Sequence, residues 1–226
     1  MTSNFVVTID GPAGAGKSSV AKRLAERLNL RYLDTGAIYR AVAFILHRSG
    51  IEPKETSRLQ ETLGELRVCL SEEGVFVGEE NVTAAIRSPE VDRIVSAYSA
   101  LRSVRKALLF LQREQLKYGA LVVEGRDVGS VVFPDAPLKL FVTASDEVRA
   151  LRRFLELQRK GDSISFDEVL ETIRKRDRID STREIAPLTV PDDAIHLDTS
   201  DMTEDEVLDK LTLLAKAAME GRGEGE

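Results

Sequence analysis

The sequence is poor in the residues that build disulfides, metal clusters and aromatic surfaces. Its 226 residues include no tryptophan, one cysteine and two histidines. The single Cys69 excludes an internal disulfide and a cysteine-based metal cluster, and it fits a reducing compartment such as the cytoplasm. His47 and His196 lie far apart in the sequence, which argues against a zinc site or a histidine base. No apolar run is long enough to cross a membrane, and no signal peptide is evident. We therefore expect a cytoplasmic protein without a membrane partner.

An acidic charge balance narrows the range of partners. The formal net charge is −6, the pI is about 5.2 and aromatic residues make up 5% of the chain, which together argue against a nucleic-acid partner. A hydrophobic content of 42% and a charged content of 31% are typical of a globular protein. The length fits one domain with small insertions, and the lack of a broad apolar stripe favours a monomer.

Five short β-type runs alternate with helical patterns along the chain. They cover residues 5–9, 30–33, 120–124, 138–142 and 194–197, and four of the five are apolar enough for buried parallel strands. Helical periodicity is clear in residues 104–111, 166–173 and 207–218. This alternation predicts an α/β fold with a doubly wound, five-stranded parallel sheet flanked by helices. Ligands of such sheets bind beyond the carboxyl ends of the strands.

The first predicted strand leads into a glycine-rich segment with the pattern G-x-x-x-x-G-K-S. Its residues are Gly11, Pro12, Ala13, Gly14, Ala15, Gly16, Lys17 and Ser18, followed by Ser19. Between a strand and a helix, this pattern predicts a P-loop whose backbone N–H groups bind the phosphates of a nucleoside triphosphate. Lys17 would reach the β- and γ-phosphates, and the Ser18 hydroxyl is suited to hold Mg²⁺. The alternative is a glycine turn before an ordinary amphipathic helix, with Lys17 in solvent.

Two stretches interrupt the strand–helix alternation. Residues 66–82 alternate in polarity around a turn at 71–74, which predicts a small antiparallel hairpin inserted into the core. Residues 149–163 are rich in arginine and end at Gly161. The polar, glycine-containing tail, residues 220–226, is expected to be disordered.

Arginine dominates the basic residues in the C-terminal half of the chain. Between residues 149 and 183 arginine outnumbers lysine eight to two and the net charge is +3, although the whole chain is acidic. Forked guanidinium groups suit bidentate contacts with phosphate. A solvated helix face with i,i+4 ion pairs is the alternative for any single arginine. Arginine also stands beside carboxylates in residues 33–40, 124–127 and 176–183, at one predicted sheet edge, which indicates an anionic ligand that carries hydroxyls.

Five motifs together resemble the bacterial cytidylate kinase family in its long form. They are DGPAGAGKS at 10–18, LDTGAIYR at 33–40, EGRD at 124–127, VVFPDA at 131–136 and REIAPL at 183–188. The similarity runs from about residue 4 to about residue 215 and includes the hairpin. A P-loop alone names only a superfamily, whereas the second and third motifs are far more specific.

The resemblance implies a P-loop nucleoside monophosphate kinase that phosphorylates CMP and dCMP with ATP and Mg²⁺ by direct in-line transfer. It implies a core at 1–34, 98–148 and 164–219, a monophosphate-binding region at 35–97 with a β insert at about 64–86, and a helical lid at 149–163. By motif position, Thr35, Arg40, Arg126 and Arg183 resemble the clamp on the CMP phosphate, and Tyr39 lies within the same substrate-binding motif. Ser96, Arg105 and Asp127 match residues that read cytosine, and Arg176 and Asp180 match residues that hold the ribose. Lys17, Arg126 and the lid arginines Arg152, Arg153 and Arg159 would stabilise the transferring phosphoryl group.

Other interpretations remain open for these residues. The chain could be another small-substrate P-loop kinase, of the UMP/CMP or shikimate type, although the hairpin and the Arg105–Asp127 pair weigh against this. A nucleotide-binding switch module is a further alternative, but the sequence contains no Asn-Lys-x-Asp guanine-reading segment. Asp180 could also pair with Arg176 one helical turn earlier.

Overall fold

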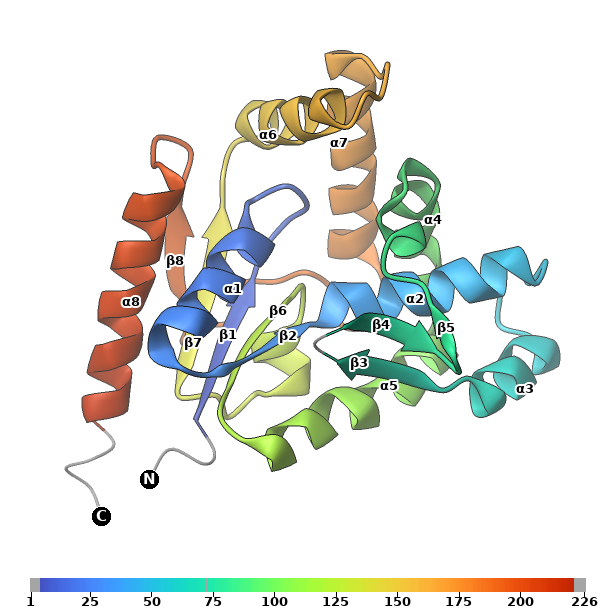
Figure 1. Cartoon of the computed structure of the whole chain (residues 1–226), viewed down its shortest axis with the longest axis horizontal. Coiled ribbons are helices and arrows are strands. Elements are labelled where there is room, and N and C mark those ends of the chain that lie inside the picture. Colours follow the sequence, from blue (N-terminus) through green and yellow to red (C-terminus); the bar gives the residue numbers. More distant parts are fainter. Residues whose placement is uncertain (1–4, 72, 222–226) are drawn as a thin grey trace.

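A five-stranded parallel sheet forms the centre of the computed structural model, which describes residues 5–71 and 73–221. The strand order is β2-β6-β1-β7-β8 (Figure 1). The strands are β1 (Val6–Asp10), β2 (Arg31–Asp34), β6 (Leu121–Gly125), β7 (Leu138–Thr143) and β8 (Ile195–Asp198). All neighbouring pairs are parallel, so the predicted fold class is confirmed.

The three central strands, β6, β1 and β7, are buried on both faces, and their successive residues point to opposite sides of the sheet. Val6 packs into the apolar cluster on one face, whereas Val7 and Ile9 pack into the cluster on the other. Helices α1 (Lys17–Leu28) and α8 (Glu204–Glu220) cover the second face. Capping boxes begin α8 at Thr203 and begin α7 (Phe166–Thr182) at Ser165, which satisfies the first N–H groups of each helix.

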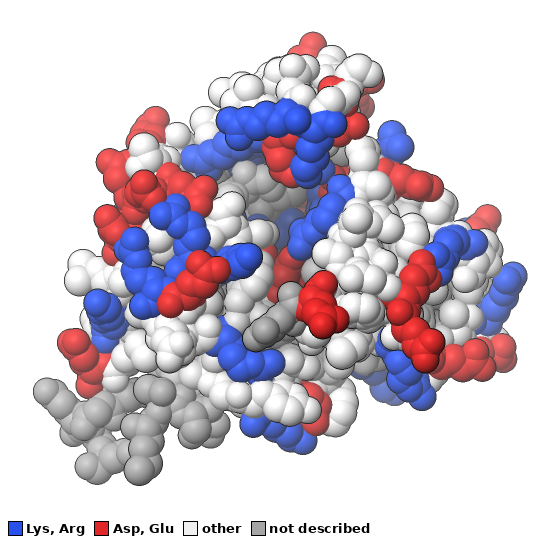
Figure 2. Space-filling view, viewed as in Figure 1, with Lys and Arg blue, Asp and Glu red and all other residues white. Residues whose placement is uncertain are grey.

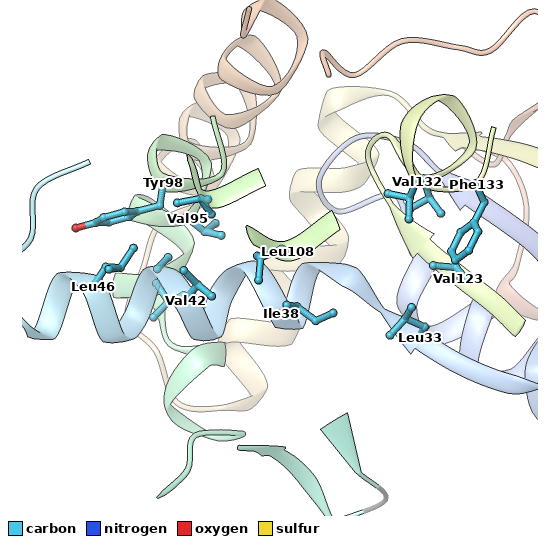
Figure 3. Packing of buried hydrophobic residues seen from close by; sticks show 14 of the residues in the cluster. Leu33, Ile38, Val42, Leu46, Val95, Tyr98, Leu108, Val123, Val132 and Phe133 are labelled. Atoms are coloured by element: carbon cyan, nitrogen blue, oxygen red, sulfur yellow. The ribbon is translucent and has the colours of Figure 1, made fainter. Parts of the chain in front are cut away.

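The first face is covered by α2 (Thr35–Arg48), α4 (Pro89–Ser99) and α5 (Arg102–Glu114). Figure 3 shows one side of α2 packed against this core, with Ile38, Val42 and Leu46 in line along the helix. Tyr98 of α4 is buried beside them, and its hydroxyl donates a hydrogen bond to the carbonyl of Ile51. This packing fixes α2 and α4 relative to the sheet edge at which polar residues gather.

The arginine-rich segment lies on α6 (Asp146–Arg159), which packs against α7 above the sheet (Figure 1). These two helices have an apolar cluster of their own, formed by Ala150, Leu157, Val169 and Ile173. The predicted lid therefore begins three residues inside a helix that starts at Asp146. The predicted division of the chain into core, monophosphate-binding region and lid stays a prediction.

The insert differs in detail from the predicted hairpin. It is a three-stranded antiparallel sheet of β3 (Val68–Ser71), β4 (Gly74–Val77) and β5 (Glu80–Asn81), preceded by α3 (Ser57–Glu65) and followed by a 3-10 turn, η1 (Ala85–Arg87). The prediction missed β5 because two polar residues give no alternation signal. The predicted turn includes Glu72, which lies outside the described residues. Of the predicted tail, Glu220 ends α8, and residues 222–226 lie outside the described residues.

Two short elements complete the chain, a 3-10 turn, η2 (Gln115–Tyr118), and a single π-helical turn, η3 (Val128–Val132). Across the described ranges, no helix is long and apolar enough to cross a membrane.

Candidate active site

The glycine-rich loop joins β1 to the N-terminus of α1 and adopts a conformation that needs its glycines. Gly14 and Gly16 have positive φ angles of 76° and 81°, a region that side chains disfavour. A Cβ on Gly11 would lie 1.9 Å from the carbonyl oxygen of Val142 in β7, so the loop could not pass the sheet with a larger residue. The strand–loop–helix context confirms the predicted P-loop architecture.

Lys17 is the buried cation at the centre of this loop. Its side-chain amine donates a hydrogen bond of 2.7 Å to the carbonyl of Pro12, and the residue is 5% exposed. The pKa of Lys17 is lowered to about 7, chiefly by burial and also by the nearby charge of Arg126, whereas the charges of Glu124 and Asp10 act in the opposite direction. An anionic phosphate beside Lys17 would favour its charged form.

The carboxylate of Glu124, at the end of β6, faces the first turn of α1. It accepts a 2.7 Å hydrogen bond from the Tyr32 hydroxyl, and the Ser18 hydroxyl lies close enough to lower the pKa of Glu124. Burial raises the pKa of Glu124, and the nearby Asp34 raises it further. The Thr35 hydroxyl donates a 2.6 Å hydrogen bond to the backbone carbonyl of Glu124, which connects the start of α2 to β6.

Asp10 fixes the loop that follows β6. Its two carboxylate oxygens accept hydrogen bonds from the backbone N–H groups of Val128, at 2.8 Å, and Gly129, at 2.7 Å. Burial raises the pKa of Asp10 to about 6, although these two hydrogen bonds act in the opposite direction. The η3 turn is thereby held so that Arg126 and Asp127 face the site.

Asp127 binds two arginines from different elements. One carboxylate oxygen pairs with Arg105 of α5, and the other lies 3.1 Å from Arg183, just after α7. The Arg105 guanidinium also lies over the ring of Tyr39, 5.3 Å from its centroid. The structure therefore brings together Asp127, Arg105, Arg183 and Tyr39, all of which were predicted site residues.

Asp180 pairs differently from the expected helical contact. Its carboxylate lies 3.1 Å from Nε of Arg126 and 3.9 Å from a guanidinium nitrogen of Arg183. Its predicted partner, Arg176, instead bonds to Asp92 at 3.0 Å. The helical pairing was therefore wrong, because two arginines outside α7 reach Asp180.

A residue that sequence reasoning missed is Asp92, on α4. Its carboxylate pairs with Arg40, Arg153 and Arg176, which come from α2, α6 and α7. Burial would raise the pKa of Asp92, but the charges of these three arginines outweigh it and lower the pKa to about 2. An aspartate in the first turn of a helix is common for helix-dipole reasons, so nothing in the sequence indicates this role.

These groups line one cavity of about 320 Å³ beneath α6 (Figure 2). The predicted site residues on its wall are Ala13, Gly14, Ala15, Gly16, Lys17, Ser18, Ser19, Thr35, Tyr39, Arg40, Ser96, Arg105, Arg126, Asp127, Arg153, Arg176, Asp180 and Arg183. Charged residues that were not predicted there are Asp34, Arg87, Asp92, Arg93 and Glu124. Nine basic side chains thus face five carboxylates, which favours an anionic ligand.

Four predicted site residues lie off this wall. Gly11 and Pro12 are buried at the start of the loop and do not line the cavity. Arg159 is exposed at the end of α6 and lines neither cavity, so its predicted role stays a prediction. Arg152 donates a 2.7 Å hydrogen bond to the carbonyl of Thr199 and lines a second cavity of about 290 Å³. The other residues around this second cavity are Ala15, Gly16, Val20, Thr199, Met202, Thr203, Glu204 and Val207.

A doubly wound sheet with a P-loop at its carboxyl edge and an arginine-lined cavity beside it defines a P-loop kinase. Among solved structures, a gluconokinase from Sinorhizobium meliloti 1021 has the same fold, with a TM-score of 0.50, 15% identity and 100% of each chain covered. An uncharacterized protein from Eubacterium ventriosum gives a TM-score of 0.51 at 14% identity, with 95% of this chain and 99% of that chain covered.

The sequence comparisons are more specific than the fold. The sequence model of the family described as cytidylate kinase matches residues 7–217, and the chain belongs to this family. A cytidylate kinase from Mycobacterium leprae is 46% identical over 215 residues, which cover 95% of this chain and 96% of that protein. A cytidylate kinase from Caldanaerobacter subterraneus is 45% identical over 205 residues, which cover 91% and 92% of the two chains.

Proposed function

We propose that this member of the cytidylate kinase family transfers the γ-phosphoryl group of ATP to CMP and dCMP by direct in-line attack. The observation that carries the proposal is the buried Asp127–Arg105 pair, which lies in the same cavity as the P-loop lysine. The acceptor nucleotide would occupy the wall formed by α2, α4, α5 and the loop after β6. The ATP phosphates would lie on the P-loop residues 11–19.

The Asp127–Arg105 pair has the chemistry to select cytosine. Cytosine presents an amino donor at N4 and an acceptor at N3, and uracil reverses both. A carboxylate facing N4 and a guanidinium facing N3 would pair with cytosine, with Ser96 nearby on the same wall. Uracil would leave buried polar groups unpaired, at a cost of about 1–3 kcal/mol per group.

The remaining predicted residues would hold the phosphate and the ribose of the acceptor. Thr35, Arg40, Arg126 and Arg183 form the proposed phosphate clamp. Arg176 and Asp180 form the proposed ribose site, and both are in the cavity wall. Among the described residues, Nε of Arg176 is buried without a hydrogen-bond partner, so an oxygen of a bound nucleotide would satisfy it.

The second cavity would receive the base of ATP. It begins at Ala15 and Gly16 of the P-loop, so a nucleotide whose phosphates lie on the loop can extend into it. Met202 and Val207 provide apolar surface, and Arg152 provides a planar cation.

The transfer needs no general base in this arrangement. The second pKa of a phosphate monoester is about 6, so the attacking oxygen of CMP is already deprotonated at neutral pH. A bond forms between that oxygen and the γ-phosphorus, the bond from the γ-phosphorus to the β,γ-bridging oxygen breaks, and ADP leaves. Lys17, Arg126 and Arg153 would stabilise the charge on the transferring group, and the lid helices would exclude water.

The residues beside the P-loop fit a magnesium ion. The Ser18 hydroxyl and the Glu124 carboxylate both line the cavity, and Mg²⁺ prefers such oxygen ligands together with substrate phosphates. The ion would shield the negative charge of the phosphates as the nucleotides approach. We further propose a monomeric enzyme of the cytoplasm without a nucleic-acid partner, in keeping with one cysteine and a net charge of −6.

Steady-state assays of ADP release with CMP, dCMP, UMP and AMP test this proposal. We expect turnover with CMP and dCMP, and a lower kcat/KM with UMP and AMP. Lys17→Ala should abolish transfer while its circular dichroism spectrum stays that of the wild type. A higher kcat/KM with UMP or AMP would refute the proposed specificity, and tight GTP binding without CMP-dependent turnover would favour a switch module.

A further inference from the structure

The carboxylate of Asp92 binds three arginines that belong to three other helices. One oxygen accepts hydrogen bonds from Arg40 of α2 and, at 3.0 Å, from Arg176 of α7. The other oxygen accepts one from Arg153 of α6. The Asp92 side chain is 10% exposed, so these ion pairs are shielded from solvent. The monophosphate-binding region and the predicted lid are therefore joined through one carboxylate.

The three arginines also line the cavity, where the proposed function gives each of them a nucleotide to bind. The inference that follows rests on that function. A guanidinium fork binds a carboxylate and a phosphate through the same parallel N–H donors. Asp92 and the phosphates of the bound nucleotides therefore compete for Arg40 and Arg153. Asp92 also competes with the ribose hydroxyls for Arg176.

In the protein without a nucleotide, the carboxylate of Asp92 offsets the repulsion among the positive charges that surround it. Three guanidinium groups within reach of one carboxylate repel one another, and a partly buried site screens that repulsion poorly. Arg153 has one further partner, the half-exposed Glu156 at 2.7 Å. A second carboxylate of this wall, Asp180, is paired with Arg126. The low pKa of Asp92 keeps its carboxylate ionised at neutral pH.

We propose that Asp92 is a positioning residue that substitutes for the phosphate of the substrate in the free enzyme. It orders Arg40, Arg153 and Arg176 before CMP binds, and it must release donors when the CMP dianion arrives. Its negative charge also repels that dianion. The wild-type enzyme consequently binds CMP more weakly than the same arginines would without Asp92.

The test compares Asp92→Asn with a control that removes one charge from the same helix, Glu90→Gln. The Glu90 side chain is 61% exposed and pairs with His47 at 3.3 Å, away from the cavity wall. Calorimetric titration with CMP should give a Kd about tenfold lower for Asp92→Asn, equivalent to about 1.4 kcal/mol. Cytidine has no phosphate and would meet only Arg176 of the three arginines, so its Kd should decrease much less than the Kd for CMP. Glu90→Gln should match the wild type with both ligands.

Thermal unfolding gives a second readout that a purely structural role would not produce. Without ligand, Asp92→Asn should melt at a lower temperature, because it leaves buried guanidinium groups without their counter-charge. Saturating CMP should then raise the Tm of the variant more than that of the wild type. Asp92→Ser is the second variant if the asparagine protein does not fold, with the same expected decrease in Kd.

A folded variant whose Kd for CMP is unchanged or higher overturns the inference, as does equal tightening toward CMP and cytidine. These outcomes differ from a failure of the proposed function, which would appear as absent CMP turnover in the wild-type enzyme.

Discussion

Asp127→Asn should reduce the preference for CMP over UMP. The Asp127 side chain is 7% exposed, and its two oxygens hold Arg105 and Arg183. An amide keeps one acceptor oxygen but replaces the other with an NH₂ donor, which can pair with O4 of uracil. The wild-type carboxylate cannot do so, and the unpaired buried groups cost about 1–3 kcal/mol. The ratio of kcat/KM values for CMP and UMP should therefore fall by about 5- to 150-fold.

The assay is ADP release at several concentrations of each nucleotide, with the unfolding midpoint in urea measured in parallel. The variant should also be less stable, because a buried arginine loses its partner. Asp209→Asn is the matched control. The Asp209 side chain lies on α8, is 71% exposed and pairs with Arg27 of α1, and neither residue lines the cavity. An unchanged ratio in a folded Asp127→Asn protein would refute the base-reading role of this carboxylate.

Three further predictions concern the two nucleotide sites. The charged form of Lys17 attracts phosphate, and the pKa of Lys17 in the free protein is about 7. The value of kcat/KM for ATP should therefore fall as the pH rises through about 7. A profile that is flat to about pH 9 would contradict this prediction. Gly11→Ala should lower the free energy of unfolding in urea by about 2 kcal/mol or more, because the new Cβ would meet the Val142 carbonyl. Gly50 also has a positive φ but lies in open space, so Gly50→Ala should lower the free energy of unfolding by only about 1 kcal/mol. Arg152→Ala should raise the KM for ATP about fivefold and leave the KM for CMP unchanged; equal effects on both would contradict the placement of the ATP base.

The five strands of the sheet could be predicted because four of the five runs are apolar enough for buried parallel strands and all five alternate with helical patterns. Every predicted run nevertheless ends one residue before the strand does. The extra residues are Asp10, Asp34, Gly125, Thr143 and Asp198. Four of these residues are aspartate or glycine, which have low strand propensity, so the pattern excludes them, but the hydrogen-bonded ladder continues through them. Three of them, Asp10, Asp34 and Gly125, belong to the site or to its support.

Arginines and carboxylates of residues 33–40, 124–127 and 176–183 lie together at the sheet edge, as predicted. Which arginine pairs with which carboxylate could not be predicted. Arg149 shows why. Its guanidinium donates a 2.7 Å hydrogen bond to the carbonyl of Ala13 and pairs with Asp177 at 2.5 Å, so it anchors the P-loop to α6 and α7. Local sequence does not distinguish this structural arginine from Arg153, four residues later, because the distinction depends on contacts with distant segments.

The pairing of almost every cavity arginine with a carboxylate has a consequence for catalysis. Asp127 holds Arg105 and Arg183, Asp180 holds Arg126, and Asp92 holds the arginines of three helices. Groups held by Asp127 and Asp180 need little reorganisation when charge develops on the transferring phosphoryl group, which is how fixed charges lower a barrier. The arginines held by Asp92 would instead change partner when CMP binds, before the transfer. The same carboxylates reduce the attraction for any single anion. Since nine basic side chains still face five carboxylates, the wall keeps an excess of positive charge that favours anionic ligands.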